Sequence, residues 1–264
     1  SSRIYIFIFS VTASFLIAKV LVNLFNPPFG WDSLNYHFTF PVEWFKQGNL
    51  NTPITVFDDP SPTYYPINGS LFYLWLIMPF KSVFLADLGQ LPFFIIAVIS
   101  VYGIAQRIGL NKTNSFYSAV LFALIPNFFK QLQIAYVDLM VAALFLVCVN
   151  YLLALRKDFN LRNALIYSLS LGLLIGTKTT ALPFSVLLII PFLLICFKHC
   201  RKANLGLIFI LCVLFFGGFS YLRNFIETGN PLYPLDFSLL NMNIFKGVMS
   251  KATYASHFNA WDYS

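Results

Sequence analysis

Residues 163–197 read NALIYSLSLGLLIGTKTTALPFSVLLIIPFLLICF, and this stretch decides how the chain crosses a membrane. As one α-helix at about 1.5 Å per residue it would be about 52 Å long, whereas the hydrocarbon core of a bilayer is about 30 Å thick. The helix must therefore break. The segment GTKTTALP (176–183) supplies a glycine, a charged lysine and a proline without an N–H donor. The sequence thus predicts two spans here, 163–177 and 181–197.

The whole chain has the composition of a membrane protein. Of its 264 residues, 58% are hydrophobic and 10% are charged, whereas a soluble domain has about 25% charged residues. The mean hydropathy is +0.74. Because a spanning helix needs about 20 apolar residues, we expect an all-α polytopic membrane protein with seven spans. These are 3–25, 87–106, 113–129, 137–155, 163–177, 181–197 and 204–222.

The net charge of +7 is spread over short basic flanks between the apolar runs. This pattern is typical of orientation signals and argues against a nucleic-acid surface. The positive-inside rule places the N-terminus in the cytoplasm, because the basic flanks then fall inside and the first outer segment, 26–86, is net acidic. The lipid bilayer is therefore a predicted partner, and nucleic acid is not.

The first outer segment, 26–86, is too long for a simple connection. Apolar residues recur at helical spacing over 33–46, which predicts an amphipathic juxtamembrane helix. A second apolar stretch, 68–80, is too short to span and is predicted to lie at the interface. Residues 223–264 would begin a further outer segment, and we expect residues 1–264 to be one transmembrane domain that is incomplete.

Asp32 and Asp138 stand at the outer starts of two predicted helices. Aspartate is a good N-cap, and a negative charge is stabilised at a helix N-terminus, so both residues have a structural explanation. The functional alternative is that a carboxylate at the membrane surface acts as a general base. An ionisable group at this depth is also costly unless it faces protein or water. We therefore predict one shared polar site.

Lys178 and Arg223 fall at outer helix ends, where the positive-inside rule disfavours cations. Each therefore calls for a partner. A phosphate group at the membrane surface would be one, with Lys178 as a point charge and Arg223 as a two-pronged donor. The alternative is that both side chains extend toward the lipid headgroups.

His37 flanks Asp32 in the sequence and is predicted to bind substrate beside it. Tyr64 and Tyr65 precede a proline and are candidates for stacking against a sugar ring. Their alternative role is in an aromatic belt at the membrane interface. The histidines and cysteines show no metal-ligand spacing, so the sequence predicts no metal and no other cofactor.

Several motifs, taken in their order and on a common side of the membrane, carry a family resemblance. The chain resembles the membrane half of the GT-C glycosyltransferases, and within them the protein O-mannosyltransferases and the bacterial aminoarabinose-transferase-like proteins. The resemblance extends over about residues 1–236. Its motifs are GWDSLNYH (30–37), TYYPINGSLFYLW (63–75), AYVDL (135–139), GLLIGTKTT (172–180) and RNFIETGNPLYP (223–234).

This resemblance implies a GT-C-like helix bundle in a bacterial plasma membrane and a sugar donor linked to polyprenyl phosphate. Transfer to an acceptor hydroxyl would occur on the extracytoplasmic face, with inversion. By motif position, Asp32 would be the first-loop catalytic aspartate and Asp138 the second-loop acidic residue, while Lys178 and Arg223 would contact the lipid phosphate. Some relatives have an acidic pair in the first loop, whereas here Asp32 is followed by serine, which argues against a metal-assisted mechanism.

Two other classes of function are compatible with the same residues. A transporter or flippase of lipid-linked glycans would also need a cation for the phosphate and buried acids. A scaffold subunit would keep the fold without activity. Transporters often have paired repeats with broken helices near the membrane midplane, whereas this sequence has one predicted break and gathers its polar residues at one face. The enzyme is therefore the preferred hypothesis.

Overall fold

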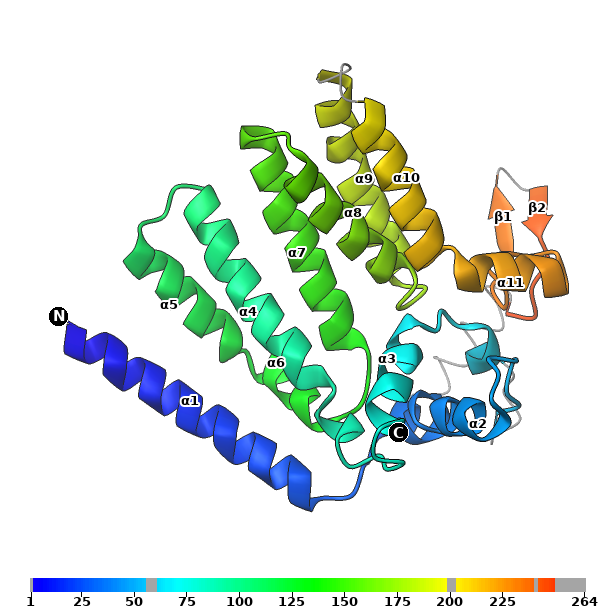
Figure 1. The fold of residues 1–264 in the computed structure, drawn as a ribbon, viewed down its shortest axis with the longest axis horizontal. Coiled ribbons are helices and arrows are strands. Elements are labelled where there is room, and N and C mark those ends of the chain that lie inside the picture. Colours follow the sequence, from blue (N-terminus) through cyan, green and yellow to red (C-terminus); the bar gives the residue numbers. More distant parts are fainter. Residues whose placement is uncertain (1, 56–60, 199–202, 240–241, 250–264) are drawn as a thin grey trace, which may run out of the picture.

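The structure, a computed structural model, describes residues 2–55, 61–198, 203–239 and 242–249. It is mostly helical, with one two-stranded antiparallel sheet, β1–β2 (Figure 1). The α-helices are α1 (Ser2–Phe25), α2 (Thr39–Gln47), α3 (Asn68–Ile77), α4 (Gln90–Arg107), α5 (Lys112–Ala123), α6 (Pro126–Lys130), α7 (Asp138–Lys157), α8 (Leu161–Ile175), α9 (Ala181–Lys198), α10 (Ala203–Gly217) and α11 (Phe219–Thr228). The strands are β1 (Phe237–Leu239) and β2 (Met242–Phe245). A π-helix covers Ser33–His37, and 3₁₀ helices cover Ser61–Tyr64, Ala86–Leu88 and Gln131–Gln133.

Four helices of the described chain are long and apolar enough to cross a membrane, and a fifth is added if α10 and α11 form one bent span. The four are Arg3–Phe25, Ala86–Arg107, Asp138–Lys157 and Ala181–Lys198. The structure is therefore consistent with a membrane protein. The apolar helix α8 is shorter than these spans.

Two of the seven predicted spans are not continuous helices. In place of one helix over 113–129, α5 ends at Ala123 and α6 begins at Pro126. Ile125 is extended, because the residue before a proline is disfavoured in the helical region. In place of one helix over 204–222, α10 and α11 meet at Gly217–Gly218 with a bend of 61°.

The break predicted within 163–197 is present. Helix α8 ends at Ile175 and α9 begins at Ala181, so the GTKTT segment forms the turn between them. The Tyr167 hydroxyl of α8 donates a hydrogen bond to the Leu188 carbonyl of α9 over 2.7 Å, which holds the two helices side by side. The turn therefore presents Lys178 at one end of the bundle.

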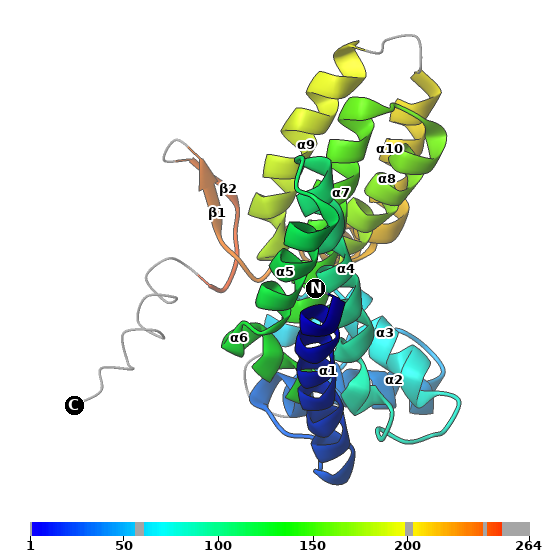
Figure 2. The same cartoon turned by 90° about the vertical axis from the view of Figure 1, so that its left-hand side faces the viewer.

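The main hydrophobic core lies between α7, α8, α9 and α10. Tyr167 stacks on Phe192, and Phe192 stacks on Phe209, with ring centroids 4.7 and 4.6 Å apart. Helix α1 lies on the outside of the bundle, at the lower left of Figure 1 and facing the viewer in Figure 2. It is fixed by a hydrogen bond from the Tyr5 hydroxyl to Thr113 (2.9 Å) and by stacking of Phe15 on Phe129 (4.4 Å).

The described residues of the segment 26–86 and of the chain after α11, up to residue 249, lie at the same end of the bundle, next to the α8–α9 turn. The predicted amphipathic helix 33–46 is present as the π-helix and α2, and its buried side chains include Tyr36, Phe40 and Trp44. The predicted interfacial segment 68–80 contains α3, which ends at Ile77. Segments far apart in the sequence thus meet at one end of the bundle.

Candidate functional site

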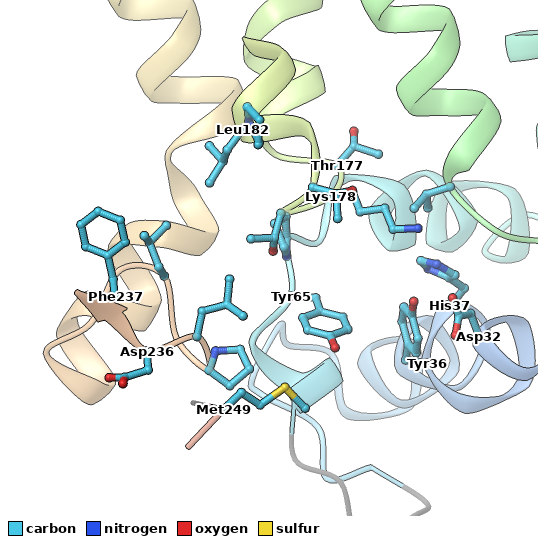
Figure 3. Close-up of a pocket in the computed structure, with 18 residues that line it drawn as sticks. Asp32, Tyr36, His37, Tyr65, Thr177, Lys178, Leu182, Asp236, Phe237 and Met249 are labelled. Atoms are coloured by element: carbon cyan, nitrogen blue, oxygen red, sulfur yellow. The ribbon is translucent and has the colours of Figure 1, made fainter. Parts of the chain in front are cut away.

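A cavity of about 730 Å³ lies where these segments meet (Figure 3). Four parts of the described chain line it. They are residues 32–37 and 65–66, Val137 before α7, the α8–α9 turn with the start of α9, and residues 232–237 and 249 after α11. Asp32, Tyr36, His37 and Lys178 lie on one side of the cavity, and the opposite side carries mostly apolar side chains together with Asp236. The lining residues used below are Asp32, Tyr36, His37, Tyr65, Thr177, Lys178, Leu182, Leu232, Leu235, Asp236, Phe237 and Met249.

Asp32 reaches the cavity because the chain turns sharply at Gly30. Gly30 has φ +99°, and a Cβ atom there would lie 2.7 Å from Ile134 Cγ2, so both the backbone angle and the space require glycine. Asp32 itself has helical backbone angles, and its side chain accepts no capping hydrogen bond. The Asp32 side chain therefore does not cap the π-helix, although the sequence allowed that role.

Tyr36, one helical turn after Asp32, is buried beside it. Burial raises the pKa of the Tyr36 hydroxyl most, and the charge of Asp32 and a hydrogen bond to Asp32 raise it further. The hydroxyl therefore stays protonated and donates to the carboxylate. This contact orients Asp32 while leaving carboxylate lone pairs for another group.

His37 is only 3% exposed and lies between the Asp32–Tyr36 pair and Lys178. Its Nδ1 atom is 3.2 Å from Ser70 Oγ. Its Nε2 atom is buried, and within the described chain it has no hydrogen-bond partner. Burial lowers the pKa of His37, and the positive charge of Lys178 lowers it further. The imidazole is therefore neutral at neutral pH and keeps one nitrogen for a ligand in the cavity.

Lys178 and Asp138 form an ion pair, with Nζ 2.8 Å from Oδ1. Asp138 is the first residue of α7, and Lys178 comes from the α8–α9 turn, so the pair joins two helix ends. Lys178 therefore has a protein partner and does not extend to lipid headgroups alone. An ammonium has three donors, so Lys178 can still bind a ligand in the cavity that it lines.

The two predicted tyrosines have different surroundings. Tyr65 lines the cavity and packs edge-on against Tyr36, with centroids 5.8 Å apart. Tyr64 does not line it and instead packs edge-on against Tyr233, with centroids 4.5 Å apart. Tyr65 is thus the one placed to contact a ligand.

Arg223 is also outside the cavity lining. Its Nη2 atom donates to the Thr63 carbonyl over 3.0 Å and to Asn224 Oδ1 over 3.2 Å. Asn224 Nδ2 in turn donates to the Tyr64 carbonyl over 2.8 Å. These contacts fix the 61–65 segment to α11. The structure therefore brings Asp32, Asp138, Lys178, His37 and Tyr65 together at the cavity. Arg223 and Tyr64 lie outside it, where the 61–65 segment contacts α11.

The model of one protein family, described as "Domain of unknown function (DUF8201)", matches residues 71–257. The chain belongs to the DUF8201 family. No curated protein and no solved structure matches it. The DUF8201 match includes the ion pair Asp138–Lys178, whereas Asp32, His37 and Tyr65 precede it.

Among the groups in the cavity of this DUF8201 protein that the sequence did not predict as site residues are Tyr36, Thr177 and Asp236. Tyr36 was detectable from its spacing, because it follows Asp32 by four residues on one helical face. Thr177 lines the cavity from the GTKTT turn, and Asp236 lines it from the chain after α11. Asp236 reaches the cavity through the tertiary fold, and no local sequence pattern indicated this position.

Among the described residues, no group of three or more His, Cys, Asp or Glu side chains is arranged to hold a metal ion. Residues 250–264 of the predicted outer segment lie outside the described residues. The cavity itself combines the Asp32 carboxylate, an ammonium and a neutral imidazole at one side with leucine, phenylalanine and methionine side chains and the Asp236 carboxylate at the other. Such a cavity suits a ligand with an anionic or hydroxyl-bearing head and an apolar tail.

Proposed function

We propose that this protein is a GT-C-like, multi-pass glycosyltransferase of a bacterial plasma membrane. It would move a sugar from a polyprenyl-phosphate donor to an acceptor hydroxyl on the extracytoplasmic face, with inversion. The observation that carries this proposal is the two-sided cavity, with Asp32 and Lys178 at one side and a wall of mostly apolar side chains opposite. A polyprenyl-phosphate sugar has the same division between a polar head and an apolar chain.

Asp32 is the proposed general base. The acceptor hydroxyl oxygen forms a bond to the anomeric carbon, and its proton passes to Asp32. The bond from the anomeric carbon to the phosphate oxygen breaks, and the electron pair leaves with the polyprenyl phosphate. A single displacement of this kind inverts the anomeric carbon. Tyr36 supports the role of Asp32, because its hydroxyl fixes the carboxylate without taking its charge.

Lys178 is the proposed contact of the leaving phosphate, whose negative charge grows as the bond breaks. The ion pair with Asp138 holds the ammonium in one place, so its position is set before the donor binds. Asp138 therefore acts through Lys178 and is assigned a positioning role. The neutral His37 Nε2 atom and the Tyr65 ring are left to contact the sugar head group or the acceptor.

The apolar side of the cavity would hold the first isoprene units of the donor. Leu182 lies at the start of α9, while Leu235 and Phe237 lie in the chain after α11. These residues come from segments at the outer ends of the helices, so the lipid chain would reach the cavity from the bilayer. With its isoprene units in this position, the donor would have its phosphate at the same depth in the membrane as Lys178.

Transfer of radiolabel tests the proposal directly. Membranes containing the full chain are incubated with polyprenyl-phosphate sugars labelled in the sugar, and label is measured in the lipid and non-lipid fractions. The proposal predicts loss of label from the lipid in wild-type membranes and none above background in Asp32→Asn membranes. Label that crosses the membrane while still attached to the lipid would instead establish the transporter.

A further inference from the structure

A second polar cluster lies outside the cavity, where α1, α4 and the 3₁₀ helices Ala86–Leu88 and Gln131–Gln133 meet. The Asn23 side chain of α1 joins them, because its Nδ2 atom donates to the Asp87 carbonyl over 3.0 Å and to the Leu132 carbonyl over 3.4 Å. Gln90 follows Asp87 by three residues and donates its Nε2 to the Tyr136 carbonyl. The Tyr73 hydroxyl donates to the same carbonyl over 2.6 Å.

This junction contains four buried oxygen atoms that accept no hydrogen bond from the described chain. They are both carboxylate oxygens of Asp87, Oε1 of Gln90 and Oε1 of Gln131. Asp87 is 4% exposed and Gln90 is fully buried. The amide orientation of Gln90 is fixed, because its Nε2 atom is already used on the Tyr136 carbonyl. Within the described chain, the buried side-chain atoms of this junction that lack a hydrogen-bond partner are all acceptors, and this arrangement favours a positively charged ligand.

Within the described chain, no cationic side chain compensates Asp87, since the ion pairs are Lys46–Glu43 and Lys178–Asp138. Lys19 of α1 lies over the Phe129 ring, 5.7 Å from its centroid. The charge of Asp87 acts on the Tyr73 hydroxyl, whose pKa is raised mainly by burial. Asp87 also lies within the candidate span Ala86–Arg107. An uncompensated buried carboxylate is unfavourable, so Asp87 is expected to be neutralised by a proton or by a bound counter-charge.

We propose that Asp87, Gln90 and Gln131 bind a monovalent cation of the sodium type at this junction. One carboxylate balances one positive charge, and the other ligands are neutral oxygens, which suit hard cations. If Asp87 were protonated, its O–H group would donate to one of the other oxygens. The remaining two of the four oxygens would still lack a partner. Neutral hydrogen-bond donors would bond to the four oxygens, but the negative charge of Asp87 would stay uncompensated. A divalent ion would leave a net positive charge in an apolar region.

The bound cation would join α1 to the outer ends of α4 and α7. Asp87 precedes α4, Gln131 belongs to the segment before α7, and Asn23 holds both segments from α1. Tyr136, which accepts from Gln90, is two residues before Asp138 of the ion pair. The site therefore stabilises the position from which α7 presents Asp138, and it does not depend on the proposed glycosyltransferase activity.

Thermal unfolding of the full chain in detergent tests this site without any substrate. The melting temperature is measured in choline chloride with increasing NaCl, KCl, LiCl or CaCl₂ at constant ionic strength. The proposal predicts a saturable rise with Na⁺, because a ligand of the folded state stabilises it by mass action. In Asp87→Asn the Na⁺ dependence is lost, and in the exposed control Asp158→Asn it is kept.

Gln131→Leu provides a second variant in case Asp87→Asn does not fold. It removes one neutral oxygen and keeps the carboxylate, so the Na⁺ concentration at half-effect should rise about tenfold or more. A wild-type melting temperature that is the same in all four salts overturns the proposal. So does a Na⁺ response that Asp87→Asn retains. Higher stability of Asp87→Asn in every salt would show that a proton, and not a cation, neutralises Asp87.

Discussion

Asp32 and Asp138 stand at helix starts at the same end of the bundle, yet their surroundings differ. Asp138 Oδ1 lies 2.8 Å from the Lys178 ammonium. Asp32 has no cationic partner within the described chain and accepts a hydrogen bond from the buried Tyr36 hydroxyl. The first carboxylate therefore holds a lysine in place, while the second is oriented and still able to accept a proton. Two acids that look alike in sequence are thus assigned different roles.

The largest expected effect is on turnover in Asp32→Asn. Asparagine keeps the shape but is not a general base, so the rate of sugar transfer should fall by about 10²- to 10⁴-fold. Asp32 accepts no capping hydrogen bond, and the asparagine side-chain oxygen can still accept from the Tyr36 hydroxyl, so the melting temperature of Asp32→Asn should match that of the wild type. Asp32→Ala should melt at a lower temperature, because the buried Tyr36 hydroxyl loses its acceptor. Full activity in Asp32→Asn would remove Asp32 from the mechanism, and Asp158→Asn provides the matched exposed control.

The second prediction concerns acid pH, because His37 lies beside Asp32 and feels the charge of Lys178. Burial and Lys178 lower the pKa of folded His37 below its ordinary value of about 6.5. As the pH falls below about 6.5, the unfolded chain therefore binds a proton that the folded chain does not. This loss of stability approaches about 1.4 kcal/mol per pH unit.

Thermal melts from pH 7.5 to 5.0 check this prediction by comparing wild type with His37→Gln. Glutamine does not titrate, so its melting temperature should fall less steeply with pH than that of the wild type. The difference between the two curves isolates His37 from the other titrating groups. Parallel curves would contradict a neutral, buried His37.

A smaller effect is expected for Asp138→Asn. The partners are 42% and 29% exposed at the side chain, and a solvent-screened ion pair is worth about 1 kcal/mol or less. The variant should therefore lose less than about tenfold in turnover, and most of the loss should be in apparent donor affinity. Kinetics over a range of donor concentrations separates the two parameters. A loss as large as that of Asp32→Asn would show that Asp138 takes part directly.

The smallest effect is expected for Arg223→Lys. Lysine keeps the charge and one donor for the Thr63 carbonyl, so the unfolding free energy should fall by less than about 1 kcal/mol. Donor affinity should stay unchanged, because Arg223 does not line the cavity. Lys178→Ala is the contrasting variant, with weaker donor binding. A drop in affinity for both variants would place Arg223 on the phosphate, as the sequence first suggested.

Length and periodicity predicted much of the fold. The break at GTKTT followed from the length of residues 163–197, and it places Lys178 at the cavity. The interruptions at Pro126 and at Gly217–Gly218 were missed, because apolar runs continue across both positions. Backbone interruptions inside apolar runs change the helix axis without changing the composition, so a hydropathy criterion does not detect them.

The candidate site was predicted only in part. Asp32 was predicted because a carboxylate at the membrane is costly unless it faces protein or water, and His37 because it flanks Asp32. Lys178 was predicted because the positive-inside rule disfavours cations at outer helix ends. The sequence did not reveal that Lys178 already pairs with Asp138, nor that Arg223 bonds a backbone carbonyl. Both facts depend on contacts between residues at least 40 positions apart. Local patterns identify the residue types, and the tertiary fold decides their partners.

The central claim is that the cavity end of the bundle faces the extracytoplasmic side, and thiol labelling in intact cells tests it most directly. The structure guides the choice of positions, because Ser61 and Asn230 at this end are buried, whereas Asn49 is exposed there and Asp158 is exposed at the opposite end of α7. An impermeant maleimide should label Asn49→Cys from outside and label Asp158→Cys only after the membrane is opened. Labelling of Asp158→Cys in intact cells, with Asn49→Cys protected, would contradict the proposed site and its reaction.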